Sequence, residues 1–349
     1  MEEERDWKTD DFDYELPEEL IAQSPAERRD QSRLLVVDRK SGTFQHRVFA
    51  DLVDLIAPGD VLVLNETRVF PARLKGRRSG GGEAEALLLH PAADDPDLWL
   101  AMVRPGAKLR AGRTVFVSDE LAVEIVTQLE SGERLVRFLT DLPLEEALQR
   151  YGEVPLPPYV RRRATEEDRE RYQTVYARER GSVAAPTAGL HFTPELLDRI
   201  VARGVEIARL VLHVGPGTFR PVEAERPEQH RLHSEWYRVT EEAARTINAA
   251  RAAGGAVWAV GTTSVRTLET VADKAGVVRA GEGWTDIFIR PPYRFRAVDR
   301  LVTNFHLPRS TLLMLVSAFG GHELVLRAYS EAVRQRYRFY SYGDAMAIL

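Results

Sequence analysis

The chain of 349 residues contains no cysteine. Disulfide bonds, thiolate metal ligands and a thiol nucleophile are therefore excluded, and the absence is compatible with a reducing compartment. The longest apolar run near the end, residues 312–319, contains Ser317 and is far shorter than the ~20 residues that cross a bilayer. The opening residues MEEERDWKTDDFDYE lack the basic start and the apolar stretch of a signal peptide. We therefore expect a soluble protein of the cytoplasm.

An excess of basic residues is also missing. Lys and Arg number 48 against 53 Asp and Glu, and the net charge of −5 excludes a uniformly basic nucleic-acid-binding protein. Twelve of the acids, with four bases, lie in residues 1–30, which leaves residues 31–349 with a net charge of +3. A local basic surface is therefore still compatible with the composition. At about 150 residues per domain, the length predicts two domains.

Two different textures alternate along the chain. Between about residues 71 and 140, short runs rich in Leu, Val and Phe are separated by turn residues about every ten positions, which predicts a small antiparallel β-barrel or sandwich. Residues 1–65 and 154–349 instead alternate strand-like and helix-like segments, which predicts a mostly parallel sheet with helices packed on it. The simplest account is an α/β domain formed by 1–65 and 154–349, with a β-rich domain inserted at 66–153.

Capping signals place three helices in the second α/β segment. Thr193-Pro194-Glu195 is the pattern of an N-cap, a proline at the first helical position and an acid in the first turn. Thr240 opens a second helix, and a third follows Gly261-Thr262-Thr263-Ser264. Glycines end each of them, so the predicted helices span about 194–203, 241–253 and 265–275. The apolar runs 210–214 and 256–260 are predicted strands.

The first candidate for chemistry is GLHF at 189–192, directly before the Thr193 helix. A histidine on the entry loop of a helix is accessible to a ligand, and His191 could act as a general base, a general acid or a hydrogen-bond donor. A capping or packing histidine explains the same pattern equally well.

The second candidate is LHVGPGTF at 212–219, where a predicted strand carrying His213 ends in Gly215-Pro216-Gly217-Thr218. Open α/β sheets bind ligands at this end of a strand, and glycines allow a close approach of the backbone. The spacing matches neither a P-loop nor a dinucleotide-binding fingerprint. Turn chemistry alone also accounts for the glycines.

The third candidate is AVGTTSVRT at 259–267, a strand followed by Gly261, Thr262 and Thr263, with Arg266 on the opening helix. Backbone N–H groups at a helix start attract an anion, and an arginine can hold a carboxylate with two hydrogen bonds. Simple N-capping by one of the threonines explains the hydroxyls but not the arginine.

The fourth candidate is HRLHSEWY at 230–237. Its histidines are three residues apart, which with Glu235 invites a metal site, but ligands at that spacing need a helix and no further acidic cluster supports one. Acid–base or substrate-binding roles for His233 and Glu235 are favoured, and no metal is expected.

The last candidate is the basic stretch 290–309, which holds five arginines and one acid with interleaved aromatic residues. Binding of single-stranded RNA requires arginines that contact phosphates and aromatic rings that stack on bases. The run RRR at 161–163 adds to this charge. A solvated charged face is the alternative. The residues assigned to RNA binding are Arg161, Arg162, Arg290, Tyr293, Arg294, Phe295 and Arg296.

Long ordered strings between residues 11 and 346 carry a resemblance. They include NETRVFPARL (65–74), VAAPTAGLHFT (183–193), LHVGPGTFRPV (212–222), HSEWY (233–237), AVGTTSVRTLE (259–269), TDIFIRPPYRF (285–295) and LVTNFHLPRSTLLMLVSAFGG (301–321). These strings closely resemble the S-adenosylmethionine:tRNA ribosyltransferase-isomerases, a family of queuosine-biosynthesis enzymes. The chain departs from the family pattern at Glu66, where the family usually has Asn, and at Pro216, where it has Leu.

The resemblance implies a large, barrel-like α/β domain with a small inserted antiparallel β-barrel. It also implies transfer of the ribosyl part of S-adenosylmethionine onto 7-aminomethyl-7-deazaguanine at the wobble position of a tRNA with a GUN anticodon. The products are epoxyqueuosine in tRNA, adenine and methionine. S-adenosylmethionine is then a consumed substrate, no cofactor is expected, and the expected form is a monomer.

On this interpretation, acid–base groups are supplied by His191, His213, His233 and Glu235. S-adenosylmethionine is expected to contact Gly215, Gly217, Thr218, Gly261, Thr262, Thr263 and Arg266, the last three holding its carboxylate. Two alternatives stay open. A non-catalytic RNA-binding protein regulated by an adenosine ligand would need the basic stretch but not the histidines. A methyltransferase would release S-adenosylhomocysteine, although the chain lacks a glycine fingerprint after its first strand.

Overall fold

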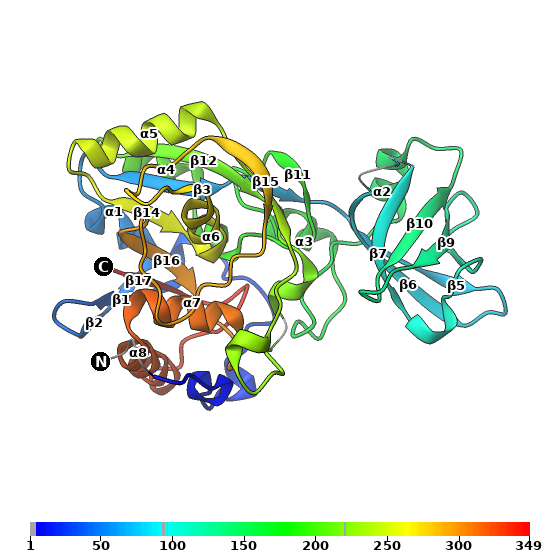
Figure 1. Ribbon diagram of the computed structural model, residues 1–349, viewed down its shortest axis with the longest axis horizontal. Helices are drawn as coiled ribbons and strands as arrows, with labels where there is room; N and C mark the ends of the chain where they lie inside the picture. Colours follow the sequence, from blue (N-terminus) through cyan, green and yellow to red (C-terminus); the bar gives the residue numbers. More distant parts are fainter. Residues whose placement is uncertain (1–4, 93–94, 96, 220) are drawn as a thin grey trace.

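The computed structural model describes residues 5–92, 95, 97–219 and 221–349, and the side chains of residues 218 and 219 are not part of the description. Its centre is a nine-stranded sheet, whose labelled strands from β12 to β2 follow one another down the left part of Figure 1. In spatial order the strands are β15 (Gly281–Thr285), β13 (Glu235–Val239), β12 (Glu206–Leu212), β3 (Val61–Asn65), β14 (Val257–Val260), β16 (Arg300–Asn304), β17 (Ala345–Ile348), β1 (Arg33–Asp38) and β2 (Thr43–Val48).

The large sheet is mixed. The four strands β12, β3, β14 and β16 run parallel, as expected, and β1 pairs parallel with β17. The expectation of a mostly parallel sheet is wrong toward its edges, because β13, β15 and β2 join antiparallel and so does β17 to β16. The strand order has two ends, β15 and β2. The large domain, which was expected to be barrel-like, is therefore built on an open sheet.

Helices cover both faces of this sheet. In β1, Leu35 and Val37 face one hydrophobic core while Leu34 and Val36 face the other, as the alternation of side chains in a strand requires. The first core is closed by α5 (Glu241–Ala252), α6 (Gly261–Val271), α7 (Thr311–Gly320) and α8 (His322–Arg334). The second is closed by α1 (Leu52–Leu55) and α4 (Pro194–Ala202). The α/β class is confirmed as a three-layer arrangement.

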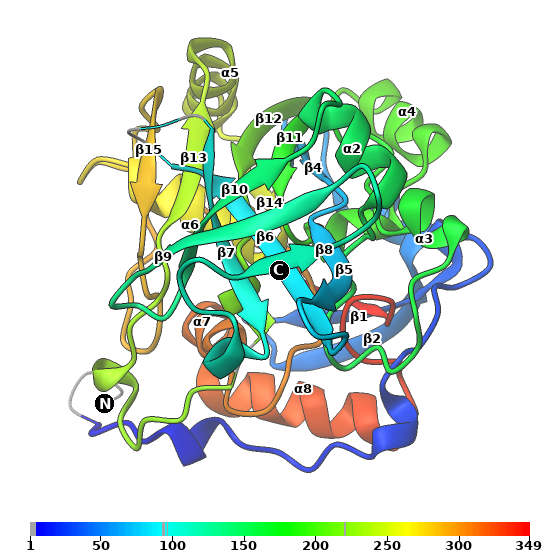
Figure 2. The same cartoon turned by 90° about the vertical axis from the view of Figure 1, so that its right-hand side faces the viewer.

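The inserted β-rich module is confirmed as a closed antiparallel barrel, which stands beside the large sheet in Figure 1 and in front of it in Figure 2. Around the barrel the strands are β10 (Arg134–Leu139), β7 (Leu98–Arg104), β6 (Glu83–Pro91), β5 (Arg73–Arg78), β8 (Thr114–Phe116) and β9 (Ala122–Gln128). Alternate residues such as Leu74, Ala86 and Val136 fill its separate core. The turn residues between the short apolar runs predicted an antiparallel barrel or sandwich, and the structure shows the barrel.

A two-stranded connection links the barrel to the sheet. The chain leaves after β4 (Thr67–Val69), and Arg73 pairs antiparallel with Glu153 on the returning segment; β11 (Glu179–Ser182) then pairs in parallel with β4. Two helices lie on the return path, α2 (Leu144–Tyr151) and α3 (Glu166–Arg171). All six barrel strands fall inside the predicted insert 66–153; its boundaries stay a prediction.

Two of the three predicted helix starts are confirmed, and the third is corrected. Thr193 accepts a hydrogen bond from the Leu196 N–H at 3.2 Å, and Thr240 accepts one from Ala243 at the same distance. The third helix begins at Gly261 itself and ends at Val271, with Val260 as its cap and no side-chain cap. N-capping by Thr262 or Thr263 is therefore wrong, because both lie inside the first turn.

No single helix in the described ranges is both long and apolar enough to span a membrane. The helices α7 and α8, bent by 114° at their junction, satisfy the same criterion only when they are taken together.

Candidate active site

The parallel strands converge at one edge of the sheet, where their carboxyl ends meet. Asn65 at the end of β3 joins this edge to β12, donating from its side-chain amide to the Leu212 carbonyl and accepting the Leu212 N–H, at 3.0 and 3.1 Å. The residues that follow the neighbouring strands are His213 after β12 and Gly261 after β14. Ligands of open α/β sheets bind at such an edge. Two of the predicted motifs are therefore brought to the same place.

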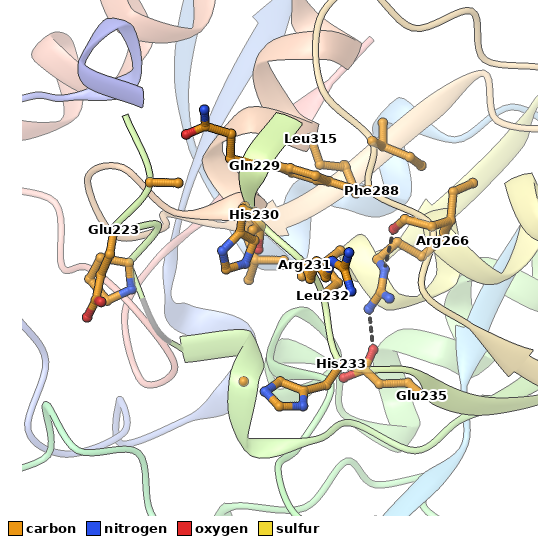
Figure 3. Close-up of a pocket in the computed structure, with 17 residues that line it drawn as sticks. Glu223, Gln229, His230, Arg231, Leu232, His233, Glu235, Arg266, Phe288 and Leu315 are labelled. Carbon is orange, nitrogen blue, oxygen red and sulfur yellow. Dashed lines mark hydrogen bonds and ion pairs between the residues drawn. The ribbon is translucent and has the colours of Figure 1, made fainter. Parts of the chain in front are cut away.

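A cavity of about 690 Å³ opens near this edge (Figure 3). Its walls combine apolar side chains with charged ones. The apolar group is Leu232, Ile287, Phe288, Ile289, Leu312 and Leu315, and the charged group is Glu223, Arg231, Glu235 and Arg266. The volume and the mixed lining are those of a small-molecule site. We refer to this space as the larger cavity.

A buried ion pair forms one wall of the larger cavity. Arg266 on α6 donates through Nη1 to Glu235 Oε2 at the start of β13, and each side chain is about 5% exposed. Arg266 Nε donates to the Ile287 carbonyl at 3.3 Å, and the Gly215 N–H donates to Glu235 Oε1 at 2.8 Å. Arg266 Nη2 is buried and has no hydrogen-bond partner among the described residues. This donor is therefore available to an anionic group of a ligand.

A second cavity, of about 350 Å³, shares His233 and Glu235 with the first and no other described residue. We refer to it as the smaller cavity. It lies between the barrel, which contributes Leu89, His90 and Glu133, and the large sheet. The two cavities thus meet at a wall that consists of two predicted site residues.

His213 lines the smaller cavity. Its Nδ1 lies 2.8 Å from Thr67 Oγ1, and its ring stacks on Trp236 with a centroid distance of 5.0 Å. Burial lowers the pKa of His213 to about 4, so the ring is neutral at pH 7. Gly181 makes room for it, because a Cβ there would lie 2.4 Å from His213 Nε2.

His233 is the most accessible of the predicted acid–base residues, with 56% of its side chain exposed. Its Nδ1 lies 4.0 Å from Glu133 Oε1 of the barrel. Gly217 permits this position, because a Cβ on it would lie 2.8 Å from the His233 ring. Gly215 lies at the smaller cavity and Gly217 at the larger, whereas the side chain of Thr218 falls outside the described part of the chain.

His191 lies elsewhere, inside the large domain and against no described cavity. Its ring nitrogens contact Ser32 Oγ at 2.7 Å and Asn304 Oδ1 at 3.3 Å, and its ring stacks on Phe49. Burial lowers its pKa to about 4. The structure does not bring His191 to the wall formed by His233 and Glu235, and its acid–base role stays a prediction.

The predicted carboxylate anchor is divided. Thr262 and Thr263 face a void of about 30 Å³ together with Asn304 and His306, whereas Arg266 faces the larger cavity. Thr262 and Thr263 precede Arg266 by four and three residues, so all three lie on one side of α6, and the two spaces are separated along the helix axis by one turn. The grouping of Thr262, Thr263 and Arg266 around one anion is therefore not found.

The residues assigned to RNA binding are largely engaged within the protein. Arg290 pairs with Glu228 at 2.8 Å. Arg296 donates from its backbone N–H to the Glu269 carboxylate at 3.0 Å and from Nη2 to the Glu269 carbonyl at 2.7 Å. Tyr293 donates to the same carboxylate at 3.2 Å, while Phe295 packs on Phe319. Arg294 is exposed.

The arginines of the RRR run have internal partners as well. Arg161 makes two hydrogen bonds of 3.0 Å to exposed Glu18. Arg162 makes two to buried Asp168, of 2.5 and 2.8 Å, and its charge together with backbone and hydroxyl donors holds the pKa of that carboxyl well below its usual range, against the effect of burial. Arg162 is thus part of the framework of α3. Its role in RNA binding stays a prediction.

Several cavity residues carried no sequence signal. Glu133 and His90 belong to the barrel and reach the site only through the arrangement of the two parts. Trp284 and Phe288 flank or belong to the quoted string TDIFI, but nothing in their spacing marked them. Glu66 lies outside both cavities, 3.9 Å from Arg178 and Arg209, whereas Pro216 lines the smaller cavity. Over the residues with assigned positions, no group of three His, Asp or Glu side chains could hold a metal ion.

Comparison with known proteins gives a consistent result. A model of the queuosine biosynthesis protein family matches residues 9–348. The chain is 62% identical to the S-adenosylmethionine:tRNA ribosyltransferase-isomerase of Symbiobacterium thermophilum over 341 residues, 97% of this chain and 99% of the relative. It is 56% identical to the enzyme of the same name from Moorella thermoacetica, over 98% of this chain and 100% of the relative.

A solved structure agrees with these relatives. The crystal structure of S-adenosylmethionine tRNA ribosyltransferase from Thermotoga maritima is 40% identical in sequence. The match covers 97% of this chain and 100% of that one, with a TM-score of 0.55. The chain therefore belongs to the queuosine biosynthesis family of S-adenosylmethionine:tRNA ribosyltransferase-isomerases, which are transferases.

Proposed function

We propose that the protein transfers the ribosyl part of S-adenosylmethionine onto 7-aminomethyl-7-deazaguanine at the wobble position of a tRNA with a GUN anticodon. The ribosyl group is isomerised to give epoxyqueuosine in tRNA, with release of adenine and methionine. Membership of the family supports this reaction. The observation that carries the proposal is the pair of cavities that share His233 and Glu235, because a transfer between two substrates needs adjoining sites. We further propose a monomer that acts in the cytoplasm.

The chemistry proposed for the family starts at the ribose carbon next to the sulfonium, whose positive charge makes that carbon acidic. A base removes its proton, and adenine leaves with the electron pair of its bond to the sugar. The aminomethyl nitrogen of the tRNA base then attacks the opened sugar and loses a proton. Closure of the epoxide expels neutral methionine. These steps are proton transfers and displacements, so the proposal includes S-adenosylmethionine as a substrate and no cofactor.

His233 is the residue that fits the proton transfers best. It lies at the wall between the cavities and is accessible, and an imidazole can act as a general base or a general acid. Glu235 accepts hydrogen bonds at both carboxylate oxygens and thereby positions Arg266 and the Gly215 loop. Its role in this proposal is to fix the geometry of the wall.

Arg266 fits the methionine carboxylate of S-adenosylmethionine. Its Nη2 is an unpaired buried donor, and a carboxylate would satisfy it with a charge-assisted hydrogen bond. The apolar side chains of the larger cavity offer contacts for the uncharged parts of the donor. Thr262 and Thr263 are not part of this anchor, because they face another void.

The test is release of free adenine from S-adenosylmethionine. The purified protein is incubated with tRNA that carries the aminomethyl base, and with the same tRNA carrying guanine as the control. We expect adenine and methionine in equal amounts with the first tRNA only. Formation of S-adenosylhomocysteine, or binding of both ligands without any product, would contradict the proposal.

A further inference from the structure

The smaller cavity has an unusual charge for a site next to RNA. Two carboxylates line it, Glu133 and Glu235, and no Lys or Arg is among the described residues that line it. The charge of Glu235 is compensated by Arg266, so Glu133 carries the negative charge of the cavity. Three histidines are also among the described residues that line it, His90, His213 and His233, and His213 is neutral at pH 7 because burial lowers its pKa to about 4. A carboxylate-lined pocket attracts a cation and repels a phosphate.

The walls of the smaller cavity are aromatic on both sides. Trp284 on β15 is 53% exposed, and its ring lies 5.0 Å from that of His90 on the barrel strand β6. Trp236 is its direct neighbour across β13 and β15 and stacks on His213. An exposed tryptophan at a cavity mouth offers a flat surface on which a base can stack. The cavity thus fits a planar aromatic ligand that carries a positive charge.

The two substrates differ in the groups that such a cavity can bind. S-adenosylmethionine carries cationic groups but also a carboxylate, and guanidinium groups to hold it, Arg231 and Arg266, line only the larger cavity. The 7-aminomethyl-7-deazaguanine base has a planar ring, an ammonium group on a short arm and no anionic group of its own. Charge complementarity therefore separates the two ligands between the two cavities.

We infer that the smaller cavity is the subsite for the acceptor base, with Trp284 stacking on its ring and Glu133 accepting a hydrogen bond from its ammonium group. This inference rests on the proposed function. Glu133 is well placed for the role, because Ser131 donates to its Oε2 at 3.1 Å and its Oε1 lies 4.0 Å from His233. The aminomethyl group would thus be held at the wall that adjoins the donor. The barrel, which carries Glu133 and His90, would complete the acceptor site.

The experiment measures binding of two anticodon stem-loops, one with the aminomethyl base and one with guanine, by fluorescence anisotropy at fixed salt. The variants are Trp284→Ala, Trp284→Phe and Glu133→Gln. Phe116→Ala is the control for tryptophan, because Phe116 is 49% exposed on the barrel and lines neither cavity. Glu130→Gln is the control for Glu133, because Glu130 is exposed on the same turn and lines neither cavity.

The two residues act on different parts of the base, so they predict different patterns. Trp284→Ala should weaken binding of both stem-loops about tenfold, since stacking does not depend on the aminomethyl group, and Trp284→Phe should restore most of the affinity. Glu133→Gln should weaken binding of the aminomethyl stem-loop about tenfold and leave the guanine stem-loop unchanged. The two control variants should bind like the wild type. Thermal unfolding checks that each variant is folded.

Calorimetric binding of S-adenosylmethionine separates the remaining outcomes. If Trp284→Ala weakens binding of S-adenosylmethionine and leaves both stem-loops unaffected, the smaller cavity holds the donor and the inference is wrong. Equal effects of Glu133→Gln on both stem-loops would also overturn it. The proposed function fails by a different result, namely absence of adenine release by the wild-type protein.

Discussion

Histidines occur in two regions of this molecule that differ in every physical respect. In one, His191 and His306 lie inside the large domain, hydrogen-bonded to Ser32, Asn304 and Thr303. Burial lowers their pKa values to about 4 and about 3. In the other, His233 is more than half exposed at the wall between two cavities. A histidine in a sequence motif can lie in either region, and its surroundings decide whether it can exchange protons at pH 7.

The buried histidines and their hydrogen bonds contribute to the stability of the fold, whereas the accessible wall between the cavities is the place proposed for the chemistry. One wall of the larger cavity contains a buried ion pair between Arg266 and Glu235, whose two charges compensate one another. Removal of one partner leaves the other charge buried and unpaired, which costs more than an exposed ion pair ever contributes. The following predictions test this division.

The largest effect is expected from Arg266→Ala. It should lower the free energy of unfolding by about 3–5 kcal/mol, because Glu235 remains buried without its partner. It should also weaken binding of S-adenosylmethionine more than binding of tRNA. The measurement is urea denaturation followed by calorimetry of both ligands. Arg238→Ala, which removes an exposed ion pair with Glu179, is the control and should cost less than about 1 kcal/mol. Equal costs for the two variants would contradict the comparison.

The second-largest effect is expected at acid pH, which should destabilise the region of the buried histidines. The folded-state pKa of His191 is about 4 and its ordinary value is about 6.5, so the unfolded chain binds a proton over this window and the folded chain does not. The stability that His191 contributes is fully present above about pH 6.5 and is lost as the pH falls toward 4. The contribution of His191 is about 3 kcal/mol. In His191→Gln the stability should fall less steeply between pH 6.5 and 4, while the two pH profiles run parallel above pH 7. Identical profiles across the whole range would refute the assignment.

His233→Ala should affect the reaction and not the fold. We expect kcat to fall about 100-fold with an unchanged urea midpoint, because the side chain is exposed and is the one proposed to transfer protons in the reaction. His46→Ala is the control, since His46 is also exposed but lies on β2 and lines neither cavity. A full rate in His233→Ala, or a large loss of stability, would remove the distinction between the two regions.

The smallest effect concerns the basic segment. Arg294 is exposed whereas Arg290 and Arg296 are half-buried, so Arg294 is the arginine of this segment from which we expect a phosphate contact. Arg294→Ala should reduce the slope of log affinity for tRNA against log salt by about 1. Arg296→Ala should leave the slope nearly unchanged. A drop of about 3 in the triple variant of Arg290, Arg294 and Arg296 would show that the internal pairs open on binding.

The fold was predictable where local signals decide it. Thr193 and Thr240 cap their helices as their sequence neighbours indicate, and recurrent turn residues predicted an antiparallel barrel or sandwich, of which the structure shows the barrel. The start of α6 was not predictable, because Gly261 adopts a φ of +85° and enters the helix directly from Val260. Nor was the mixed sheet, because the place of β17 between β16 and β1 depends on contacts between segments hundreds of residues apart.

The site was predictable as a set of motifs but not as a geometry. His213, His233, Glu235 and Arg266 were all singled out, and the structure brings them around two adjoining cavities. The ion pair between Arg266 and Glu235 joins two elements 31 residues apart, and no local pattern indicates it. Glu133 reaches His233 only because the barrel lies against the sheet edge. Thr262 and Thr263 line a different void from Arg266, although the three residues lie within one turn of α6, and no sequence pattern indicates this separation.

The pairing of β17 has a consequence for how the protein comes to be folded on the ribosome. Leu34 of β1 lies opposite Ala345 of β17, so this edge of β1 stays unpaired until β17 is synthesised, more than 300 residues later. Until then the exposed edge of β1 can pair with other chains, which is a route to aggregation during translation. The high sequence separation also predicts slow completion of folding. Chaperone dependence in a cell-free synthesis reaction is therefore an expected property of this chain.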